Sequence, residues 1–230
     1  MLFILLTITN SYSYKKLENG ILIQPKNYQS TGVKSLIIKV YSDDIIQIIG
    51  SPDNSQSAPT SLIVDDKKTL QTKFKINKQS KEIHLITNKL KVIINDHNGE
   101  ITVKNINDEI IFQEGCRQIT PGVVLQERVN HIKQSFQWAD DETLYGLGQH
   151  QEGIFNWRGC YVELFQLNMR AIVPFLLSTK GYGILWDNYS YTKFNDTHFD
   201  SFFWSEVGDA INYFFIYGPD PDILIKKAMI

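Results

Sequence analysis

The 230-residue chain lacks the residue patterns that mark several common kinds of chemical site. Its five histidines do not occur at metal-ligand spacings, which argues against a zinc site. The sequence contains neither a nucleophile elbow of the G-x-S-x-G kind nor a glycine pattern that would cradle phosphates between a strand and a helix. We therefore expect neither a metal nor an organic cofactor.

Cysteine is also scarce in this chain. Two cysteines, Cys116 and Cys160, are too few to form the disulfide framework of a small secreted domain. We expect free, buried thiols, because an unpaired cysteine behaves as a small apolar residue. A single disulfide between the two is the alternative for an exported protein.

The chain has neither a strong charge nor a long apolar run. With 23 basic and 25 acidic residues its formal net charge is -2, which gives no argument for nucleic acid or an anionic membrane as a partner. The apolar run at residues 2–8 is too short to cross a bilayer as a helix.

The short apolar run is instead typical of the start of an exported protein. Small polar residues follow it, and Ser11 and Ser13 flank Tyr12 in an arrangement that suits cleavage. We interpret residues 1–13 as a secretory signal peptide, which predicts a secreted or periplasmic protein. A buried first strand is the alternative.

What the chain has in abundance is the pattern of short β-strands. Segments rich in β-branched residues recur about every eight to twelve residues and are bounded by turn residues. Lysines alternate with apolar residues in KFKIN (73–77) and KLKVIIN (89–95), as on a sheet with one face in water. This spacing predicts an all-β sandwich. The strands are expected at residues 20–25, 35–42, 44–50, 73–77, 81–87, 89–96, 100–105, 123–129 and 131–138.

The composition changes after residue 140, where lysine becomes scarce and aromatic residues, glycine and asparagine become frequent. Buried strands are predicted at residues 172–178, 181–188 and 211–218, the first two joined by the turn STKG. The polar stretch 51–61 has the composition of an exposed loop. We interpret the later strands as part of the same sandwich, nearer to a functional surface.

A helix is predicted near the end of the sequence. Asp220 suits the N-cap, Pro221 the first helical position and Asp222 the positive end of the helix dipole. The sequence reaches Ile230 without a C-cap signal, so we expect more chain to follow this helix.

Carboxylates suited to acid–base chemistry occur mainly in predicted turns and on polar strand faces. A glycosidase needs two of them on either side of one bond. The string WADDE (138–142) holds three acids beside a tryptophan, but we interpret it as a solvated turn, because Asp and Glu form local hydrogen bonds in turns. The candidate acids are Asp140, Asp141, Glu142, Glu152, Glu163, Asp187, Asp200, Glu206 and Asp209.

The segment YGLGQHQEGIFNWRG (145–159) combines glycines, aromatic rings and an arginine in a way that core packing alone rarely produces. Trp157 offers a flat apolar face and Arg158 a forked donor. Gln166 and Asn168 lie two apart, so on a strand their amides would share one face. Aromatic planes and amides are typical of sugar-binding sites. Ordinary loop packing with a buried Trp157 is an equal alternative.

Four motifs follow one another in a recognisable order: DETLYGLGQHQEGIFNWRG (141–159), VELFQLN (162–168), IVPFLLSTKGYGILWDNYSYTKF (172–194) and INYFFIYGPDPD (211–222). In this order they resemble the N-terminal domain of glycoside hydrolase family 31, with the character of its α-xylosidase and α-glucosidase members from bacteria. The resemblance is strong over residues 141–222. Upstream of residue 141 only the strand rhythm agrees.

The resemblance implies a β-sandwich of the galactose-mutarotase-like type, packed against a catalytic (β/α)8 barrel. It implies that residues 14–217 form the sandwich and residues 218–230 begin a helix that leads into the barrel. In the family both catalytic aspartates lie on the barrel, so this chain is expected to contain neither. The Trp138–Asp140 string resembles the family's nucleophile signature, but it lies upstream of YGLG, where the family carries no catalytic group.

The resemblance also implies a role for one sandwich loop in the sugar pocket. Asn168 stands where some members place a substrate-contacting aspartate, with Gln166 beside it, and an amide there keeps the hydrogen bonding but removes the charge. The loop 166–171 is shorter than in many members. Trp157 and Arg158 are further candidates for substrate binding, with bracing of the loop or of the barrel interface as their favoured role.

The leading hypothesis is the non-catalytic N-terminal domain of a retaining α-glycosidase, present as a truncated or split product. It would act with a catalytic barrel on α-linked oligosaccharides or glycosides. The alternative is a free-standing carbohydrate-binding sandwich. A third hypothesis is a structural fragment with an exposed apolar patch where the barrel would dock.

Overall fold

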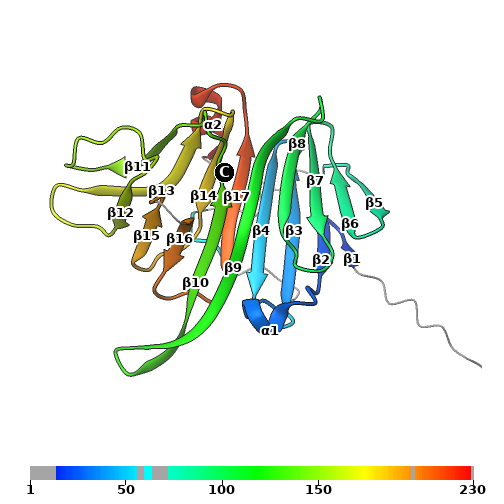
Figure 1. Ribbon diagram of the computed structural model, residues 1–230, viewed down its shortest axis with the longest axis horizontal. Coiled ribbons are helices and arrows are strands. Elements are labelled where there is room, and N and C mark those ends of the chain that lie inside the picture. Colours follow the sequence, from blue (N-terminus) through cyan, green and yellow to red (C-terminus); the bar gives the residue numbers. More distant parts are fainter. Residues whose placement is uncertain (1–13, 56–59, 64–71, 198–199, 229–230) are drawn as a thin grey trace, which may run out of the picture.

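The computed structural model describes residues 14–55, 60–63, 72–197 and 200–228. The predicted signal peptide at residues 1–13 therefore lies outside the described residues. Two antiparallel sheets form a sandwich, and helix α2 (Pro221–Ala228) lies at one end of it (Figure 1). The predicted all-β sandwich with a C-terminal helix is confirmed. Within the described part of the chain, no helix has the length and apolar character needed to cross a membrane.

The first sheet has eight strands, each antiparallel to its neighbours. In order across the sheet they are β1 (Tyr14–Leu17), β2 (Gly20–Ile23), β3 (Ser35–Ser42), β4 (Ile45–Ser51), β17 (Ile211–Tyr217), β14 (Tyr182–Trp186), β13 (Ala171–Ser178) and β11 (Leu144–Gln149). Strand β17 lies between β4 and β14, so the last strand before α2 is held in the middle of the sheet. The predicted turn at residues 178–181 joins β13 to β14, and the Gly181 N–H closes it on the Ser178 carbonyl at 3.1 Å.

The second sheet has nine strands, also antiparallel. Across the sheet they are β12 (Tyr161–Leu164), β15 (Thr192–Asn195), β16 (Ser201–Ser205), β10 (Glu127–Gln137), β9 (Ile110–Val124), β8 (Ile101–Asn105), β7 (Leu90–Asn95), β6 (Glu82–Ile86) and β5 (Lys75–Gln79). Buried and partly exposed residues alternate along β7, as the alternating lysines predict. A short helix, α1 (Tyr28–Thr31), joins β2 to β3 and was not predicted.

The apolar core lies between the two sheets and is rich in aromatic rings. Phe112 of β9 contacts Tyr182 of β14 and Phe215 of β17, with ring centroids 5.5 and 5.1 Å apart. Trp186 stacks on Phe203, which belongs to β16, at 5.3 Å. Aromatic pairs of this kind contribute about 0.5–1.5 kcal/mol each beyond their buried area. The rings therefore join one sheet to the other.

A polar network is buried within this core. Glu114 accepts hydrogen bonds from the Tyr213 hydroxyl, the Arg117 guanidinium and the Ile101 N–H. Arg117 also donates to Gln134 and to a backbone carbonyl. Burial raises the pKa of Glu114, although the charge of Arg117 opposes that effect. Because each of these groups has partners, the network fixes the pairing of the two sheets without leaving an isolated charge.

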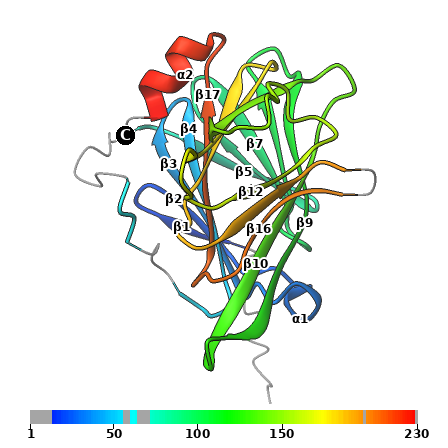
Figure 2. The same cartoon turned by 90° about the vertical axis from the view of Figure 1, so that its left-hand side faces the viewer.

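Strands β9 and β10 form a hairpin that extends well beyond its neighbours (Figure 2). Its turn is at Leu125 and Gln126, whose φ angles are 48° and 69°. The predicted strand at residues 123–129 is therefore wrong, because this turn divides it between β9 and β10. Turns with two positive φ angles usually contain glycine, asparagine or aspartate, and because Leu125 and Gln126 are none of these, no local pattern predicts this turn.

Helix α2 begins as predicted and packs on the outer face of the first sheet. The Asp220 carboxylate accepts the Asp222 N–H at 2.7 Å, as expected of an N-cap. Leu224 is buried in a cluster that includes Tyr41, Phe214 and the neighbouring apolar side chains of that face. The helix is thus attached to the sandwich by apolar contacts.

An ion-pair cluster holds the last turn of α2. The Asp44 carboxylate forms ion pairs with the Lys227 ammonium at 2.6 Å and the Lys89 ammonium at 2.7 Å. Lys227 also donates to the Tyr217 carbonyl. Burial opposes the ionisation of Asp44, but these two lysines hold its pKa below the usual value. The orientation of α2 on the sandwich is therefore set by both charge and packing.

Candidate functional site

Two loops project from one end of the sandwich and bring the predicted site residues together. The first joins β11 to β12 and the second joins β12 to β13 (Figure 1). Strand β11 lies at the edge of the first sheet, and its register against β13 shifts between Gly146 and Gly148. Both glycines have positive φ angles, and a side chain at Gly148 would lie 2.0 Å from the Ala171 carbonyl oxygen. The YGLG motif therefore forms a bulge that lets the two strands approach closely.

Trp157 fastens the first loop to the sandwich. The residue is buried, its indole N–H donates to the Gly146 carbonyl at 3.0 Å, and its backbone N–H donates to Leu144 at 2.8 Å. The His150 ring and the indole form a T-shaped pair with centroids 5.1 Å apart. This arrangement matches the packing alternative for Trp157, and a sugar contact by this ring stays a prediction.

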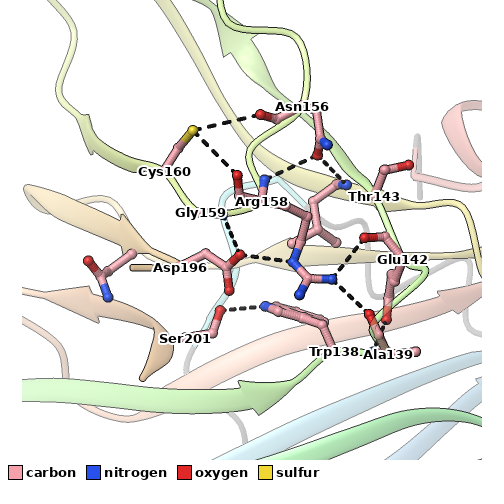
Figure 3. A network of polar contacts seen from close by, with 12 residues as sticks. Trp138, Ala139, Glu142, Thr143, Asn156, Arg158, Gly159, Cys160, Asp196 and Ser201 are labelled. Atoms are coloured by element: carbon pink, nitrogen blue, oxygen red, sulfur yellow. Dashed lines mark hydrogen bonds and ion pairs between the residues drawn. The ribbon is translucent and has the colours of Figure 1, made fainter. Parts of the chain in front are cut away.

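Arg158 joins its own loop to two other segments of the chain (Figure 3). Its Nε donates to Asp196 at 2.9 Å, and one terminal nitrogen donates to the Ala139 and Glu142 carbonyls at 2.8 Å each. The same Asp196 oxygen accepts the Gly159 N–H at 2.7 Å. The planar fork of arginine allows these contacts, so the side chain braces the loop, as favoured from the sequence.

Glu142 is a buried carboxylate within the segment predicted as a solvated turn. It accepts hydrogen bonds from the Ser178 and Tyr182 hydroxyls and from the Ala139 N–H. Burial and the adjacent Glu142 charge raise the pKa of Tyr182 well above its usual value. Residues 138–142 do form a turn, but the solvated interpretation is wrong for Glu142 because its oxygens face hydroxyls of the first sheet.

Gln166 and Asn168 do not lie on a strand, because β12 ends at Leu164. The expectation that a strand aligns their amides is therefore wrong. The Gln166 amide closes the second loop on itself: it accepts the Ile172 N–H at 3.1 Å and donates to the Arg170 carbonyl. Met169 has a positive φ of 67°, which turns the loop sharply after Asn168.

Asn168 lines an open hollow between the two loops. The hollow has a volume of about 750 Å³ and is bounded by residues 149–151 and 166–171. An ion pair between Glu152 and Arg170 joins the two loops beside it. Among the described residues the exposed Asn168 side chain has no hydrogen-bond partner, so its amide remains available to a ligand. Binding of substrate by Asn168 or Gln166 stays a prediction.

Large apolar side chains are exposed on the same two loops. Phe155 is 79% exposed and Met169 is 69% exposed. Scattered exposed apolar residues are normal, but a group on adjacent loops marks an interaction surface. The sequence feature that could have identified this surface is the number of apolar residues within two otherwise polar loops. The group consists of Ile154, Phe155, Phe165, Leu167 and Met169.

Metal binding finds no support in the part of the chain that the structure describes. No group of three or more His, Cys, Asp or Glu side chains in these residues is placed to hold an ion. Cys116 and Cys160 are both free thiols, as expected. The expectation that both are buried is wrong, because Cys116 is exposed on the outer face of β9 and Cys160 is half-buried.

Comparison with known proteins identifies the family. Residues 35–195 match the sequence profile of the family described as "Glycosyl hydrolase 31 N-terminal galactose mutarotase-like domain". The match covers more than half of the chain, and the chain belongs to this family.

Related proteins agree with this assignment. An α-xylosidase of Saccharolobus solfataricus is 34% identical over 146 residues, which are 60% of this chain and 20% of that protein. The crystal structure of a family 31 α-xylosidase from Xanthomonas citri has a TM-score of 0.68 at 31% identity and covers 78% of this chain and 19% of that one. A soil-metagenome α-xylosidase has a TM-score of 0.77 at 19% identity and covers 90% and 32%, which shows the fold alone. The chain thus spans about a fifth to a third of these relatives.

Proposed function

We propose that the chain is the non-catalytic N-terminal domain of a retaining α-glycosidase of the α-xylosidase or α-glucosidase type. In this role it supports a catalytic barrel and lends the loop 165–170 to the sugar pocket. Membership of the family and the α-xylosidase relatives support the proposal. Its substrates would be α-linked oligosaccharides or glycosides.

The observation that most supports this role is the group of exposed apolar side chains on the two projecting loops. Phe155 and Met169 would be shielded from water if a second domain covered this end of the sandwich. The hollow lined by Asn168 lies between the same loops, so a domain placed there would close it into a pocket.

The carboxylates near the loops are engaged in holding the structure together. Retaining hydrolysis requires two carboxyl groups about 5–5.5 Å apart, one as nucleophile and one as acid and base. Glu142 is buried against two hydroxyls, Asp196 is paired with Arg158, and Glu152 is paired with Arg170. This engagement supports a non-catalytic role for the sandwich.

A direct test is the hydrolysis of nitrophenyl α-xyloside and nitrophenyl α-glucoside by the purified chain. We expect no turnover above buffer. Turnover that is lost on Glu142→Gln or Glu152→Gln would overturn the proposal, because it would place catalysis within the sandwich.

A free-standing sugar-binding domain is the second candidate, favoured by the available amide of Asn168. It predicts calorimetric binding of oligosaccharides to the isolated chain that Asn168→Ala weakens. The absence of binding at millimolar sugar would exclude it.

The proposed location outside the cytoplasm rests on the sequence of residues 1–13 alone. N-terminal sequencing of the protein from its host would test it. We expect a mature chain that begins near Tyr14, and an intact Met1 would contradict export through this segment.

A further inference from the structure

A second concave site lies on the outer face of the nine-stranded sheet, away from the hollow lined by Asn168. It is a cleft of about 790 Å³ between β9 and β10 on one side and residues 158–159, 196–197 and 200–201 on the other. We call it the outer-face cleft. It shares no lining residue with the hollow between the projecting loops. The side chains that matter for its chemistry are Gln118, Lys133, Gln137, Trp138, Asp196 and Asp200.

The charges of the outer-face cleft are compensated within it. Lys133 pairs with Asp200, which also accepts the Ser135 hydroxyl at 3.2 Å. Arg158 pairs with Asp196 at 2.9 Å, and Figure 3 draws this contact as a dashed line. An ionic ligand would have to compete with these pairs, whereas a neutral ligand can bind their remaining lone pairs and N–H groups. The balance therefore favours an uncharged, hydroxyl-rich ligand.

An aromatic plane is fixed in the wall of the cleft. One face of the Trp138 indole stacks on Phe136 at 5.2 Å with an angle of 17° between the planes. Its indole N–H donates to the Ser201 hydroxyl (Figure 3). The ring is therefore held at one face by Phe136 and at its edge by Ser201. A rigid ring in an open cleft can bind the apolar face of a sugar with little loss of entropy.

The exposed side chains around this ring are polar. Gln118 and Gln137 are exposed, and their outward positions on β9 and β10 place two amides along the floor of the cleft. This contrasts with the projecting loops, where exposed apolar side chains such as Phe155 and Met169 suit contact with another protein domain. Amides, paired carboxylates and a fixed aromatic ring are together suited to sugars.

We propose that the outer-face cleft binds a neutral oligosaccharide, with Trp138 as the stacking platform and Gln118 and Gln137 as hydrogen-bond partners. The cleft has about the volume of a typical ligand pocket, which is large enough for two or three sugar units. The α-linked character of the ligand rests on the proposed function of the domain, whereas its neutral, polyhydroxylated chemistry follows from the cleft itself.

The test is calorimetric titration of the full chain with isomaltotriose. Gln118→Arg places bulk and an unpaired charge in the cleft without disturbing the core, because Gln118 is exposed. We expect it to weaken binding by at least about tenfold. The matched variant Gln79→Arg, on an exposed position at the far edge of the same sheet, is expected to leave the dissociation constant within about twofold.

Two further variants separate the outer-face cleft from the hollow. Trp138→Ala is expected to weaken binding by at least about tenfold, with circular dichroism to verify the fold. Asn168→Ala changes the hollow alone, and we expect Gln118→Arg and Trp138→Ala each to lower the affinity more than Asn168→Ala does. If Asn168→Ala abolishes binding while Gln118→Arg does not, the sugar site lies in the hollow and the proposal is wrong.

Two other results would also overturn the proposal. One is the absence of any isomaltotriose binding at concentrations up to about 20 mM. The other is tighter binding of a uronic-acid trisaccharide than of isomaltotriose, because the paired charges predict a neutral ligand. Neither result bears on the nitrophenyl glycoside test, so the failure of this inference is distinguishable from failure of the proposed function.

Discussion

Replacing Arg158 by alanine is expected to lower the free energy of unfolding by about 2–3 kcal/mol. The guanidinium holds Asp196 and the Ala139 and Glu142 carbonyls at distances of 2.8–2.9 Å. Hydrogen bonds to charged groups contribute about 1.5–3 kcal/mol, and losing one partner of a buried ion pair costs about 3–5 kcal/mol. Because 27% of the Arg158 side chain is exposed, against 9% for Asp196, water replaces part of the loss and the lower figures apply.

Urea denaturation followed by tryptophan fluorescence measures this loss. With a denaturant slope of about 2–3 kcal/mol per molar, the midpoint should fall by about 1 M. Arg158→Lys is the matched control, because lysine keeps the charge but not the planar fork, and it should recover less than half of the loss. A loss below about 0.5 kcal/mol in the alanine variant, or a lysine variant as stable as the wild type, would refute the bracing role.

Three further predictions test other parts of the structure. Although burial opposes its ionisation, Asp44 is held by Lys227 and Lys89 at a pKa below its usual value. Its stabilising effect is therefore present above the ordinary aspartate pKa of about 3.9 and is lost as the pH falls through the lower pKa of the folded protein. Lowering the pH from 5 to 3 should thus lower the unfolding temperature of the wild type more than that of Asp44→Asn. An equal dependence of the unfolding temperature on pH in the two proteins would contradict the ion-pair account. Gly148→Ala should cost at least about 2 kcal/mol, because its φ is 95° and the added carbon would meet a carbonyl, and a smaller loss in urea would show that the bulge relaxes. Trp157→Phe should cost about 1–3 kcal/mol, because the Gly146 carbonyl loses its indole partner, whereas unchanged stability would show that water replaces the N–H.

The strand framework was largely predictable because its signal is local. Alternating lysines predicted the half-exposed β7, and an Asp-Pro-Asp start predicted α2 and its N-cap. The turn at Leu125 and Gln126 was not predictable, because β-branched and apolar residues surround two positive φ angles that lack the usual glycine or asparagine.

The candidate site was only partly predictable, because its geometry depends on contacts between distant segments. The sequence identified Trp157 and Arg158 as unusual, but not that Asp196, 38 positions further on, would hold the arginine. Glu142 lies in a sequence typical of a solvated turn. Its burial depends on the hydroxyls of β13 and β14, which are distant in the sequence. The outer-face cleft was not predicted at all, since it combines residues from five segments of chain.

We propose that a catalytic domain packs on the projecting loops of the sandwich and covers them. The most direct measurement uses a chimera in which this chain replaces the matching N-terminal segment of the Saccharolobus solfataricus α-xylosidase, assayed for kcat/KM on nitrophenyl α-xyloside. We expect an active chimera whose kcat/KM falls by at least about tenfold when Phe155→Ser and Met169→Ser are combined, because both side chains would lie at the domain contact. The surface variant Gln79→Arg should leave the rate unchanged. A folded chimera without activity, or a double variant with unchanged kcat/KM, would contradict the claim.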